Sequence, residues 1–296
     1  MILNEYYTLT NGVKIPKLGL GTWFIDNDKV AEAVKEAVRL GYRHIDTTQG
    51  YGNEQGVGLG VRSCGVPREK LFITTKLEAS RKSYAESKAG IEQSLKALGL
   101  EYIDLMIIHS PQPWTDFRGE QHFYKENLEV WKALEEAYHQ GKLRAIGVSN
   151  FEKNDLENIL QHATVKPMVN QILTHIGNTP FELIDFMQEQ NILTEAYSPV
   201  AHGAILENNE LMQIANKYNV TVPQLCIRYC IQLNLIALPK TANPKHMKEN
   251  GTIDFVISEE DMKTLQNMET LDDYGEANMF PVYGGKLQAD GTYNAK

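Results

Sequence analysis

Short apolar runs alternate with segments of helical periodicity along almost the whole chain, and this alternation limits the folds it can adopt. Eight runs have the character of buried strands: KLGLGTW, YRHID, LFITTK, YIDLMIIH, RAIGVSN, PMVNQI, LTEAYSPV and LIALPK. Helical patterns fall between them at 30–40, 83–98, 128–140, 155–162, 182–189, 210–218 and 222–232. This succession predicts parallel strands joined by crossover helices. Eight such units predict an α/β fold of the (β/α)8 TIM barrel type, with a doubly wound sheet of fewer strands as the alternative.

Three segments fall outside the alternation. The Asn11-Gly12 pair between two extended runs predicts an N-terminal β-hairpin with a two-residue turn. Residues 110–126 form a long aromatic-bearing loop, and a Gly- and Tyr-rich stretch from Asp272 forms a long C-terminal loop. Long loops at a barrel mouth usually shape a substrate pocket, although the last ten residues also suit a disordered tail. No linker divides the chain, so residues 1–296 are expected to form one domain.

The composition is that of an ordinary globular protein, with 42% hydrophobic and 23% charged residues among 296. A net charge of -9 with scattered basic residues argues against binding to nucleic acid or to a membrane surface. No apolar run reaches transmembrane length, and the start lacks the pattern of a signal peptide. Cys226 and Cys230 lie in an apolar helical stretch, which favours buried reduced thiols over a metal site. A soluble cytoplasmic protein is expected.

Residues suited to redox chemistry follow four of the apolar runs. Asp46 ends YRHID, Tyr51 lies just beyond it, Lys76 ends LFITTK and His109 follows YIDLMII. In a parallel barrel the carboxyl ends of the strands converge on one mouth, so these four side chains are expected to share one cavity.

These four residues suggest a proton-donating site. A free tyrosine is a weak acid at neutral pH, and a nearby ammonium such as Lys76 would lower the pKa of Tyr51. Asp46 would hold that lysine in place, and Tyr51 with His109 would polarise a carbonyl oxygen. The resulting alkoxide needs a proton once a hydride arrives. Because no side chain can supply hydride, a nicotinamide cofactor is implied.

The remaining strand ends suit such a cofactor. Ser149, Asn150 and Gln171 carry the donors and acceptors that a carboxamide needs. Tyr197 offers a ring for stacking on a flat heterocycle. The last run ends in Lys240-Thr241, before a helix that Pro244 could open, which is a plausible phosphate site.

Each residue also has a plain structural explanation. A single Asp or Lys after a strand is usually a solvated turn residue, Asn150 could cap a helix, and His109 could be a core histidine. Those structural explanations would have to hold independently at every strand end at once, so the interpretation as one functional site is favoured.

Two other motifs are weaker. Residues 56–60 lack the final glycine of G-x-G-x-x-G, and Tyr84 with Lys88, spaced as in short-chain dehydrogenases, lies among polar residues at a helix start.

Several segments together resemble the aldo-keto reductase family. They are GYRHIDTTQGYGNEQGVG, LFITTK, DLMIIHSP, RAIGVSNF, VNQI, EAYSPV and LPKTANPKHMKEN, in the family's order and spacing from Thr10 to about Leu271. The resemblance implies a barrel whose floor is closed by the N-terminal hairpin. It also implies an NADPH-dependent enzyme, usually a monomer, that reduces aldehydes, ketones or dicarbonyls, sugar-derived or xenobiotic, without a metal.

The resemblance also assigns roles to individual residues. Tyr51 would be the general acid, tuned by Lys76 and Asp46, and His109 would orient the carbonyl. Trp23 would lie at the substrate side. Contacts with the cofactor are implied for Gly21 and Thr22 along its length, Ser149, Asn150 and Gln171 at the carboxamide, Tyr197 at the nicotinamide ring, Ser198 and Val200 at the pyrophosphate, Lys240 and Thr241 at the 2′-phosphate, and Glu249 and Asn250 at the adenine.

Two positions depart from the family pattern. Many members have an arginine that grips the 2′-phosphate where this chain has His246, and a neutral imidazole is a weaker anion partner. A preference for NADPH over NADH that is weaker than usual is therefore expected, with Lys245 as a partial substitute. Many members also have a tryptophan directly after the catalytic histidine, where this chain has Ser110. Ser110 would open the pocket wall unless Trp114 or Phe117 folds in.

A different class of function exists within the resemblance. Some similar proteins serve as cofactor-binding subunits of potassium channels and turn over poorly, and the four redox residues do not exclude that role. Those subunits have a more distant sequence pattern, and nothing in this chain indicates a channel-docking surface. The enzyme is therefore the favoured interpretation.

Overall fold

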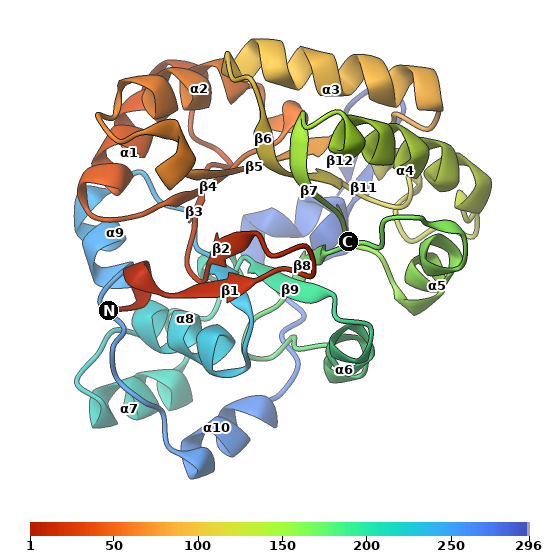
Figure 1. The fold of residues 1–296 in the computed structure, drawn as a ribbon. Helices are drawn as coiled ribbons and strands as arrows, with labels where there is room; N and C mark the ends of the chain where they lie inside the picture. The colour runs from red at the N-terminus through yellow and green to blue at the C-terminus, as the bar shows by residue number, and fades with distance from the viewer. Residues whose placement is uncertain (295–296) are drawn as a thin grey trace.

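The computed structural model describes residues 1–294, which form a barrel of eight parallel strands surrounded by helices (Figure 1). The strands are β3 (Leu20–Gly21), β4 (His44–Asp46), β5 (Phe72–Leu77), β6 (Ile103–Ile108), β7 (Leu143–Ser149), β8 (Val169–Leu173), β9 (Leu193–Tyr197) and β10 (Ile236–Leu238). They pair in chain order, and bridges from Leu18 to Ala237 and from Gly21 to Lys240 join the first strand to the last. The predicted (β/α)8 barrel is confirmed.

Ten α-helices are found within the described residues. They are α1 (Asn27–Arg39), α2 (Glu54–Ser63), α3 (Tyr84–Leu98), α4 (Tyr124–His139), α5 (Lys153–His162), α6 (Phe181–Glu189), α7 (Asn209–Lys217), α8 (Val222–Gln232), α9 (Pro244–Asn250) and α10 (Glu259–Gln266). All seven predicted helices are confirmed, as is the helix that Pro244 opens. None of the helices in residues 1–294 has both the length and the apolar character needed to cross a membrane. Cys226 and Cys230 are buried, free thiols on α8, as expected.

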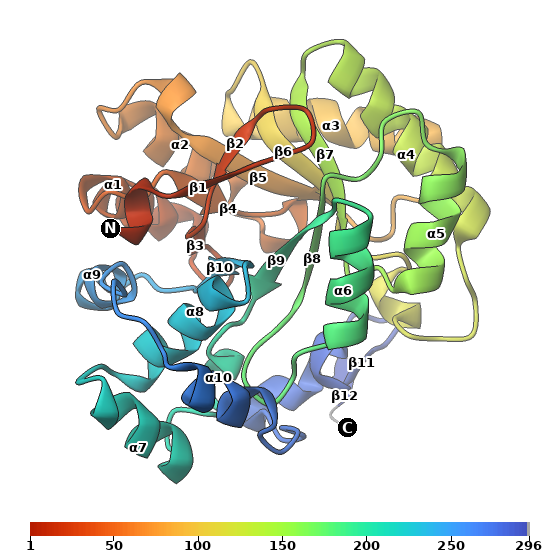
Figure 2. The same cartoon turned by 60° about the horizontal axis from the view of Figure 1, so that its bottom comes forward.

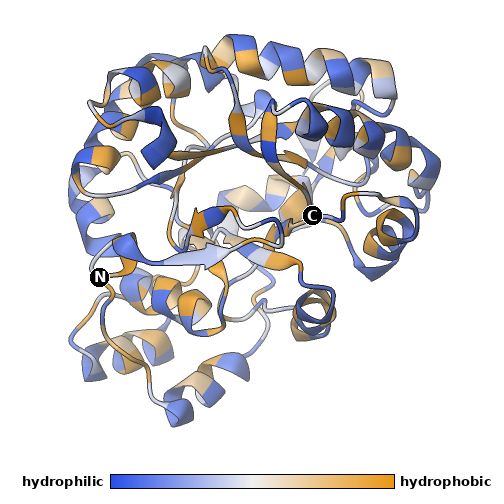
Figure 3. Cartoon of the chain, viewed as in Figure 1, coloured by the Kyte–Doolittle hydropathy of each residue, from blue (hydrophilic) through white to orange (hydrophobic). Residues whose placement is uncertain are grey.

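Hydropathy follows the two layers of the fold. The barrel strands carry mainly hydrophobic residues, whereas the surrounding helices alternate hydrophobic and hydrophilic segments (Figure 3). The strands β5 and β6 are buried along their whole length, because helices cover their outer face and side chains fill the barrel. Each helix therefore packs one apolar stripe onto the barrel and exposes the other face.

The N-terminal hairpin pairs β1 (Tyr6–Thr8) with β2 (Lys14–Pro16) in antiparallel fashion. Its turn is longer than the two residues predicted. Leu9 N donates to Val13 O at 2.8 Å, and only Gly12 within the turn has a positive φ, of 86°. The Asn11 side chain accepts from Val13 N at 3.2 Å, so the Asn11-Gly12 pair stabilises a wider turn.

The hairpin lies across one end of the barrel (Figure 1). Two of its residues are buried against side chains from the first part of the strands; this cluster contains Leu9, Ile15, Phe72, Leu105, Ile107, Val169 and Ile236. The floor of the barrel is therefore closed by apolar packing, which excludes water from the interior at that end.

The C-terminal segment lies at the other end of the barrel, away from the hairpin (Figure 2). It contains two short 3-10 helices, η6 (Gly275–Met279) and η7 (Pro281–Tyr283), and a small hairpin of β11 (Lys286–Leu287) and β12 (Tyr293–Asn294). Tyr283 is buried, and its hydroxyl lies 2.6 Å from Ser198 Oγ, which ties the segment to the loop after β9. Residues 286–294 are thus folded rather than a disordered tail, and residues 295–296 lie outside the described residues.

The small residues of α2 allow close approach of its neighbours. A Cβ on Gly58 would lie 1.9 Å from Leu98 O at the end of α3, and one on Gly56 would lie 2.2 Å from Asn27 O at the start of α1. These are backbone atoms, which cannot move aside cheaply. The glycines at 56–60 thus have a packing role and no dinucleotide motif, as predicted.

Gly58→Ala should lower the free energy of unfolding by about 1–3 kcal/mol, because the added methyl forces α2 and α3 apart. Urea denaturation measures the change. Leu59→Ala on the same helix is the control: this side chain is 54% exposed, so its loss should have little effect. Equal stability of the Gly58 variant and wild type would contradict the close contact.

Candidate active site

A cavity of about 890 Å³ lies where the barrel strands end. Most of the predicted site residues line it, namely Gly21, Thr22, Trp23, Asp46, Tyr51, His109, Trp114, Ser149, Asn150, Gln171, Tyr197, Ser198, Val200, Lys240, Thr241, His246, Glu249 and Asn250. Two do not line it. Lys76 is buried beside it, and Ser110 is buried behind its wall.

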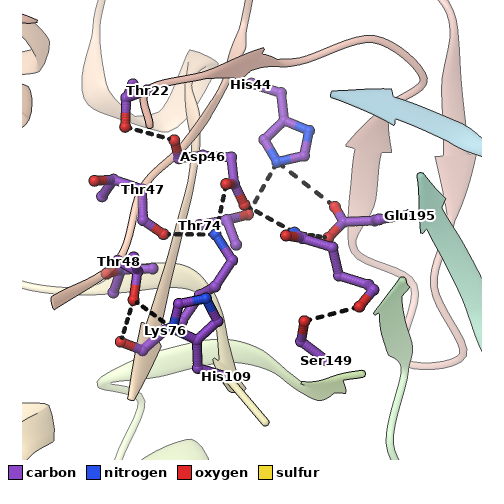
Figure 4. A network of polar contacts seen from close by, with 12 residues as sticks. Thr22, His44, Asp46, Thr47, Thr48, Thr74, Lys76, His109, Ser149 and Glu195 are labelled. Carbon is purple, nitrogen blue, oxygen red and sulfur yellow. Dashed lines mark hydrogen bonds and ion pairs between the residues drawn. The ribbon is translucent and has the colours of Figure 1, made fainter. Parts of the chain in front are cut away.

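A buried ion pair connects two neighbouring strands at the base of the cavity (Figure 4). Asp46 ends β4 and Lys76 lies on β5, and both point into the barrel. Lys76 Nζ donates to Asp46 Oδ1 at 2.6 Å and to the Thr47 carbonyl at 2.9 Å. Both side chains are almost fully buried, so each depends on the other for compensation of its charge.

Tyr51 lies above this pair. It ends a 3-10 turn, η2 (Gln49–Tyr51), which follows β4 by two residues. Lys76 Nζ is 5.4 Å from the centre of the Tyr51 ring, and the ring centres of Tyr51 and His109 are 6.3 Å apart. The structure therefore brings all four predicted catalytic side chains together.

The acidity of Tyr51 differs from the expectation. Burial raises the pKa of Tyr51 well above its ordinary value of 10, and the Asp46 carboxylate raises it further. The Lys76 ammonium, 5.4 Å from the ring, is paired with Asp46, and its effect on this pKa is outweighed by burial. Tyr51 is therefore a fully protonated phenol at neutral pH, which is the state that a proton donor requires.

His109 is a neutral imidazole. Burial and the Lys76 charge lower its pKa well below 6.5. Its Nδ1 lies 3.3 Å from Thr48 Oγ1, which also lies 3.1 Å from the Lys76 carbonyl. The Thr48 hydroxyl donates its single hydrogen to that carbonyl, so the contact at Nδ1 leaves the tautomer of the neutral imidazole to be decided by the ligand at Nε2. The His109 carbonyl accepts from Asn150 Nδ2 at 3.0 Å, which fixes the strand end.

The amide of Gln171 is shared between two carboxyl groups. Its Nε2 donates to Asp46 Oδ2 at 2.9 Å and to Glu195 Oε2 at 2.8 Å. Both amide hydrogens are thus used, which leaves the Gln171 carbonyl oxygen as the group free to accept from a ligand. Sequence reasoning missed Glu195, which lies two residues before Tyr197 on the inward face of β9.

The other two residues expected at a carboxamide are bound mainly to protein. Asn150 has a left-handed backbone (φ 60°), and its Oδ1 accepts from the Tyr197 hydroxyl at 2.7 Å. Ser149 Oγ donates to the Gln171 carbonyl of the main chain at 2.8 Å. These bonds hold the Tyr197 ring at the cavity wall.

The far end of the cavity carries the residues expected at phosphate groups. Lys240, Thr241 and the exposed His246 line it. Lys245 does not, and its Nζ lies 3.8 Å from Glu249 Oε1 on the same helix. The Lys245 side chain is therefore directed toward Glu249. Of these two neighbouring residues, only His246 lines the cavity.

Aromatic side chains form the wall near Tyr51. Trp114, on η4 (Trp114–Asp116), folds in and meets His109 edge-on with ring centres 4.9 Å apart. Ser110 does not line the cavity: its Oγ accepts from Gln112 N at 3.3 Å, and its carbonyl accepts from the half-buried Lys82 at 2.9 Å. Sequence reasoning missed other cavity residues on this side, which are Phe24, Glu78, His202, Phe280 and Tyr293. The aromatic content of the C-terminal loop was the signal for two of them.

A (β/α)8 barrel with a tyrosine, a histidine and a buried lysine–aspartate pair at its mouth, on a cavity that extends to Lys240 and Thr241, is the arrangement of a nucleotide-dependent oxidoreductase. The model of the aldo/keto reductase family matches residues 17–270, and the chain belongs to that family. It is an NAD(P)H-dependent oxidoreductase.

Individual relatives agree with this assignment. The chain is 43% identical to a glyoxal reductase of Bacillus subtilis, over 89% of this chain and 92% of that protein. It is 38% identical to a crystal structure of an aldo/keto reductase from Brucella melitensis, with a TM-score of 0.82 over 88% of this chain and 98% of that one. A crystal structure of an aldo-keto reductase complexed with NADPH is 32% identical, with a TM-score of 0.81 over 90% of this chain and 88% of that one.

Lys76→Met should lower the free energy of unfolding by about 3–5 kcal/mol, because it leaves the Asp46 carboxylate buried without a counter-charge. Adding Asp46→Asn should recover part of the loss. Urea denaturation of the single and double variants measures both effects. Lys29→Met, which breaks an exposed pair with Asp26, is the control and should change stability little. A similar loss in both lysine variants would argue against a structural role for the buried pair.

Proposed function

We propose that this protein is an NADPH-dependent carbonyl reductase in which Tyr51 is the general acid. The observation that carries the proposal is the placement of a protonated phenol and a neutral imidazole on one cavity, with a buried ammonium 5.4 Å from the phenol ring. A proton-donating site suits substrates with an oxygen that gains a proton as its carbon is reduced. Aldehydes, ketones and dicarbonyls all have such an oxygen.

The cavity residues fit a nicotinamide dinucleotide. The Gln171 carbonyl oxygen is available to accept from a carboxamide N–H, and Tyr197 presents a fixed ring for stacking. Lys240, Thr241 and His246 offer a cation, a hydroxyl and an imidazole for phosphate groups at the other end. When bound, the reduced cofactor supplies the hydride. The related NADPH complex supports this choice of cofactor.

The protein's own groups would act on the substrate oxygen. The Tyr51 hydroxyl donates a hydrogen bond to it. In the tautomer that carries its proton on Nε2, His109 donates a second, and both bonds polarise the carbonyl. The Tyr51 proton then moves to that oxygen as negative charge develops there. The Lys76 ammonium, 5.4 Å from the Tyr51 ring, stabilises the phenolate left behind.

The wall near Tyr51 favours small uncharged substrates. Trp23, Trp114 and Phe280 provide apolar surface for the rest of the molecule. Glu78, which is exposed at the same end, adds a carboxylate that disfavours anionic substrates. The similarity to a glyoxal reductase supports dicarbonyls within this class. We propose the cytoplasm as its location and a monomer as its working form.

Tyr51→Phe should lower kcat/KM for aldehyde reduction by about 10²- to 10⁴-fold, because the proton donor is lost, while NADPH binding is retained. Loss of NADPH absorbance with a panel of aldehydes measures turnover, and quenching of protein fluorescence measures binding. Tyr84→Phe is the matched control, since Tyr84 lies on α3 and bonds to Glu136 outside the cavity. Undiminished activity of the Tyr51 variant would remove Tyr51 from its role. Tight NADPH binding with negligible wild-type turnover would favour the sensor function of the channel subunits.

His246→Arg should raise the ratio of kcat/KM for NADPH to that for NADH by about tenfold, because a guanidinium binds a 2′-phosphate more strongly than an imidazole does. Wild type should still prefer NADPH, through Lys240 and Thr241. Initial rates with each cofactor measure the ratio. Lys245→Arg serves as the control, because Lys245 does not line the cavity and its ammonium lies near Glu249 on its own helix. An NADH preference in wild type would overturn the assignment of this end of the cavity.

A further inference from the structure

The barrel interior carries a polar layer directly beneath the catalytic residues. Side chains two residues apart on a strand point to the same side. Two positions before Asp46, Lys76 and Tyr197, the chain places His44, Thr74 and Glu195, and all three are fully buried. Barrel interiors are usually filled by branched apolar residues at such a level. This layer is not part of the proton-donating site, and its polarity requires another explanation.

Glu195 is joined to the catalytic residues through Gln171. The two are register partners on β8 and β9, so their side chains enter the barrel side by side. Glu195 Oε2 accepts one Gln171 amide hydrogen at 2.8 Å, and Asp46 Oδ2 accepts the other at 2.9 Å. A continuous chain therefore runs from Glu195 to Gln171, Asp46 and Lys76.

The other oxygen of Glu195 lacks a hydrogen-bond partner among the described residues. This atom, Oε1, lies 3.7 Å from His44 Nε2, which instead lies 2.9 Å from Thr74 Oγ1. A fully buried carboxylate with one hydrogen bond and no cation in contact is strongly disfavoured, whereas the protonated acid is tolerated. The proton belongs on Oε1, because Oε2 accepts from Gln171.

The charges around Glu195 favour the same protonation state. Three titratable groups face it, His44 and Asp46 from β4 and Lys76 from β5, while its register partners on β8 and β10 are Gln171 and Ile236. Burial, followed by the Asp46 charge, raises the pKa of Glu195 to about 8, although Gln171 and Lys76 oppose the shift. Burial lowers the pKa of His44 to about 3. Glu195 and His44 thus form a neutral pair at neutral pH.

We propose that Glu195 is a positioning residue of the reductase site and that it acts in its protonated, uncharged form. In this form it holds the Gln171 amide in place, and Lys76 serves as counter-ion to Asp46 alone. With its two N–H groups held by Glu195 and Asp46, Gln171 presents its carbonyl oxygen to the cofactor. When Glu195 ionises, a second carboxylate shares the charge of Lys76 and makes the phenolate of Tyr51 harder to form. The reduction rate should therefore fall as Glu195 loses its proton. The inference rests on the proposed carbonyl reduction.

The test compares Glu195→Gln with wild type in two measurements. Glutamine keeps an oxygen for Gln171 and an N–H toward His44, but it does not titrate. In wild type, kcat/KM for a neutral aldehyde at saturating NADPH should fall above about pH 8, and in the variant this decline should move up by about one pH unit or more. Glu195→Ala should lose about tenfold in kcat/KM at about pH 7, because Gln171 is released, whereas Glu195→Gln should stay close to wild type.

The second measurement needs no enzymatic activity. The pKa of Glu195 rises from 4.5 to about 8 on folding, so the folded state holds this proton where the unfolded chain releases it. Wild type therefore loses stability as the pH rises from about 4.5 to about 8, and Glu195→Gln escapes this loss. The melting temperature of the variant relative to wild type should increase across this range. A pH-independent difference, together with parallel rate profiles, would overturn the proposal.

Controls separate this proposal from the proposed function. Glu54→Gln removes another buried acid, which accepts from Thr75 Oγ1 at 2.6 Å outside the cavity, and it should leave the alkaline decline in place. If no aldehyde is reduced, the proposed function fails while the melting comparison still tests Glu195.

A further experiment applies if Glu195→Gln does not fold. The infrared absorption band of a protonated carboxyl group is then measured in the Glu54→Gln protein, which still contains Glu195. Disappearance of this band between about pH 6 and about pH 10 supports the proposal, and its absence at about pH 6 overturns it.

Discussion

The ion pair between Lys76 and Asp46 is the constraint on which the rest of the site depends. Two charges almost fully removed from water are tolerated only when each is paired and its remaining hydrogen-bonding groups are satisfied. Thr47 O takes a second hydrogen of the ammonium, and Gln171 reaches across from β8 to the free oxygen of Asp46. These bonds tie β4, β5 and β8 together at one level of the barrel. The positions of Asp46, Lys76 and Gln171 at the base of the cavity thus follow from satisfying one buried pair.

Packing below the pair sets where polar side chains can enter the barrel. Gly19 leaves room for His44, since a Cβ there would lie 2.9 Å from the imidazole and 2.7 Å from Leu238. Gly147 likewise has no space for a side chain, because a Cβ would lie 2.5 Å from Val169 O. Gly19, just before β3, therefore makes space for the buried imidazole of the polar layer, whereas Gly147 on β7 allows the close approach of the β8 backbone. A larger residue at Gly19 would displace His44 and so disturb the polar layer.

The sequence predicted those features of the structure that depend on local residue patterns. Apolar runs and helical periods located the strands and most helices, and the parallel topology then brought Asp46, Tyr51, Lys76 and His109 to one cavity. The short, highly charged α10 was not predicted, since its sequence has little apolar periodicity. The direction of the Tyr51 pKa shift was also wrong, because it depends on burial and on which partner Lys76 selects. Glu195 was overlooked because its signal, a polar residue two positions before a strand end, becomes visible only once the inward face of β9 is known.

Burial at the base of the cavity explains why the charges there are so few. Apolar residues of the hairpin exclude water from the floor of the barrel, and the C-terminal segment, anchored by Tyr283 on Ser198, contributes to the wall of the cavity at the other end. In such an interior, ionisation is unfavourable for any group without a partner. His44 and His109 are therefore neutral and Tyr51 is protonated, while the charge of Lys76 and Asp46 persists as a pair. In the proposed reduction, Tyr51 would therefore hold its proton before the substrate binds. The low polarity that keeps the proton on Tyr51 also strengthens the field of Lys76, which would favour release of that proton when charge develops on a bound carbonyl.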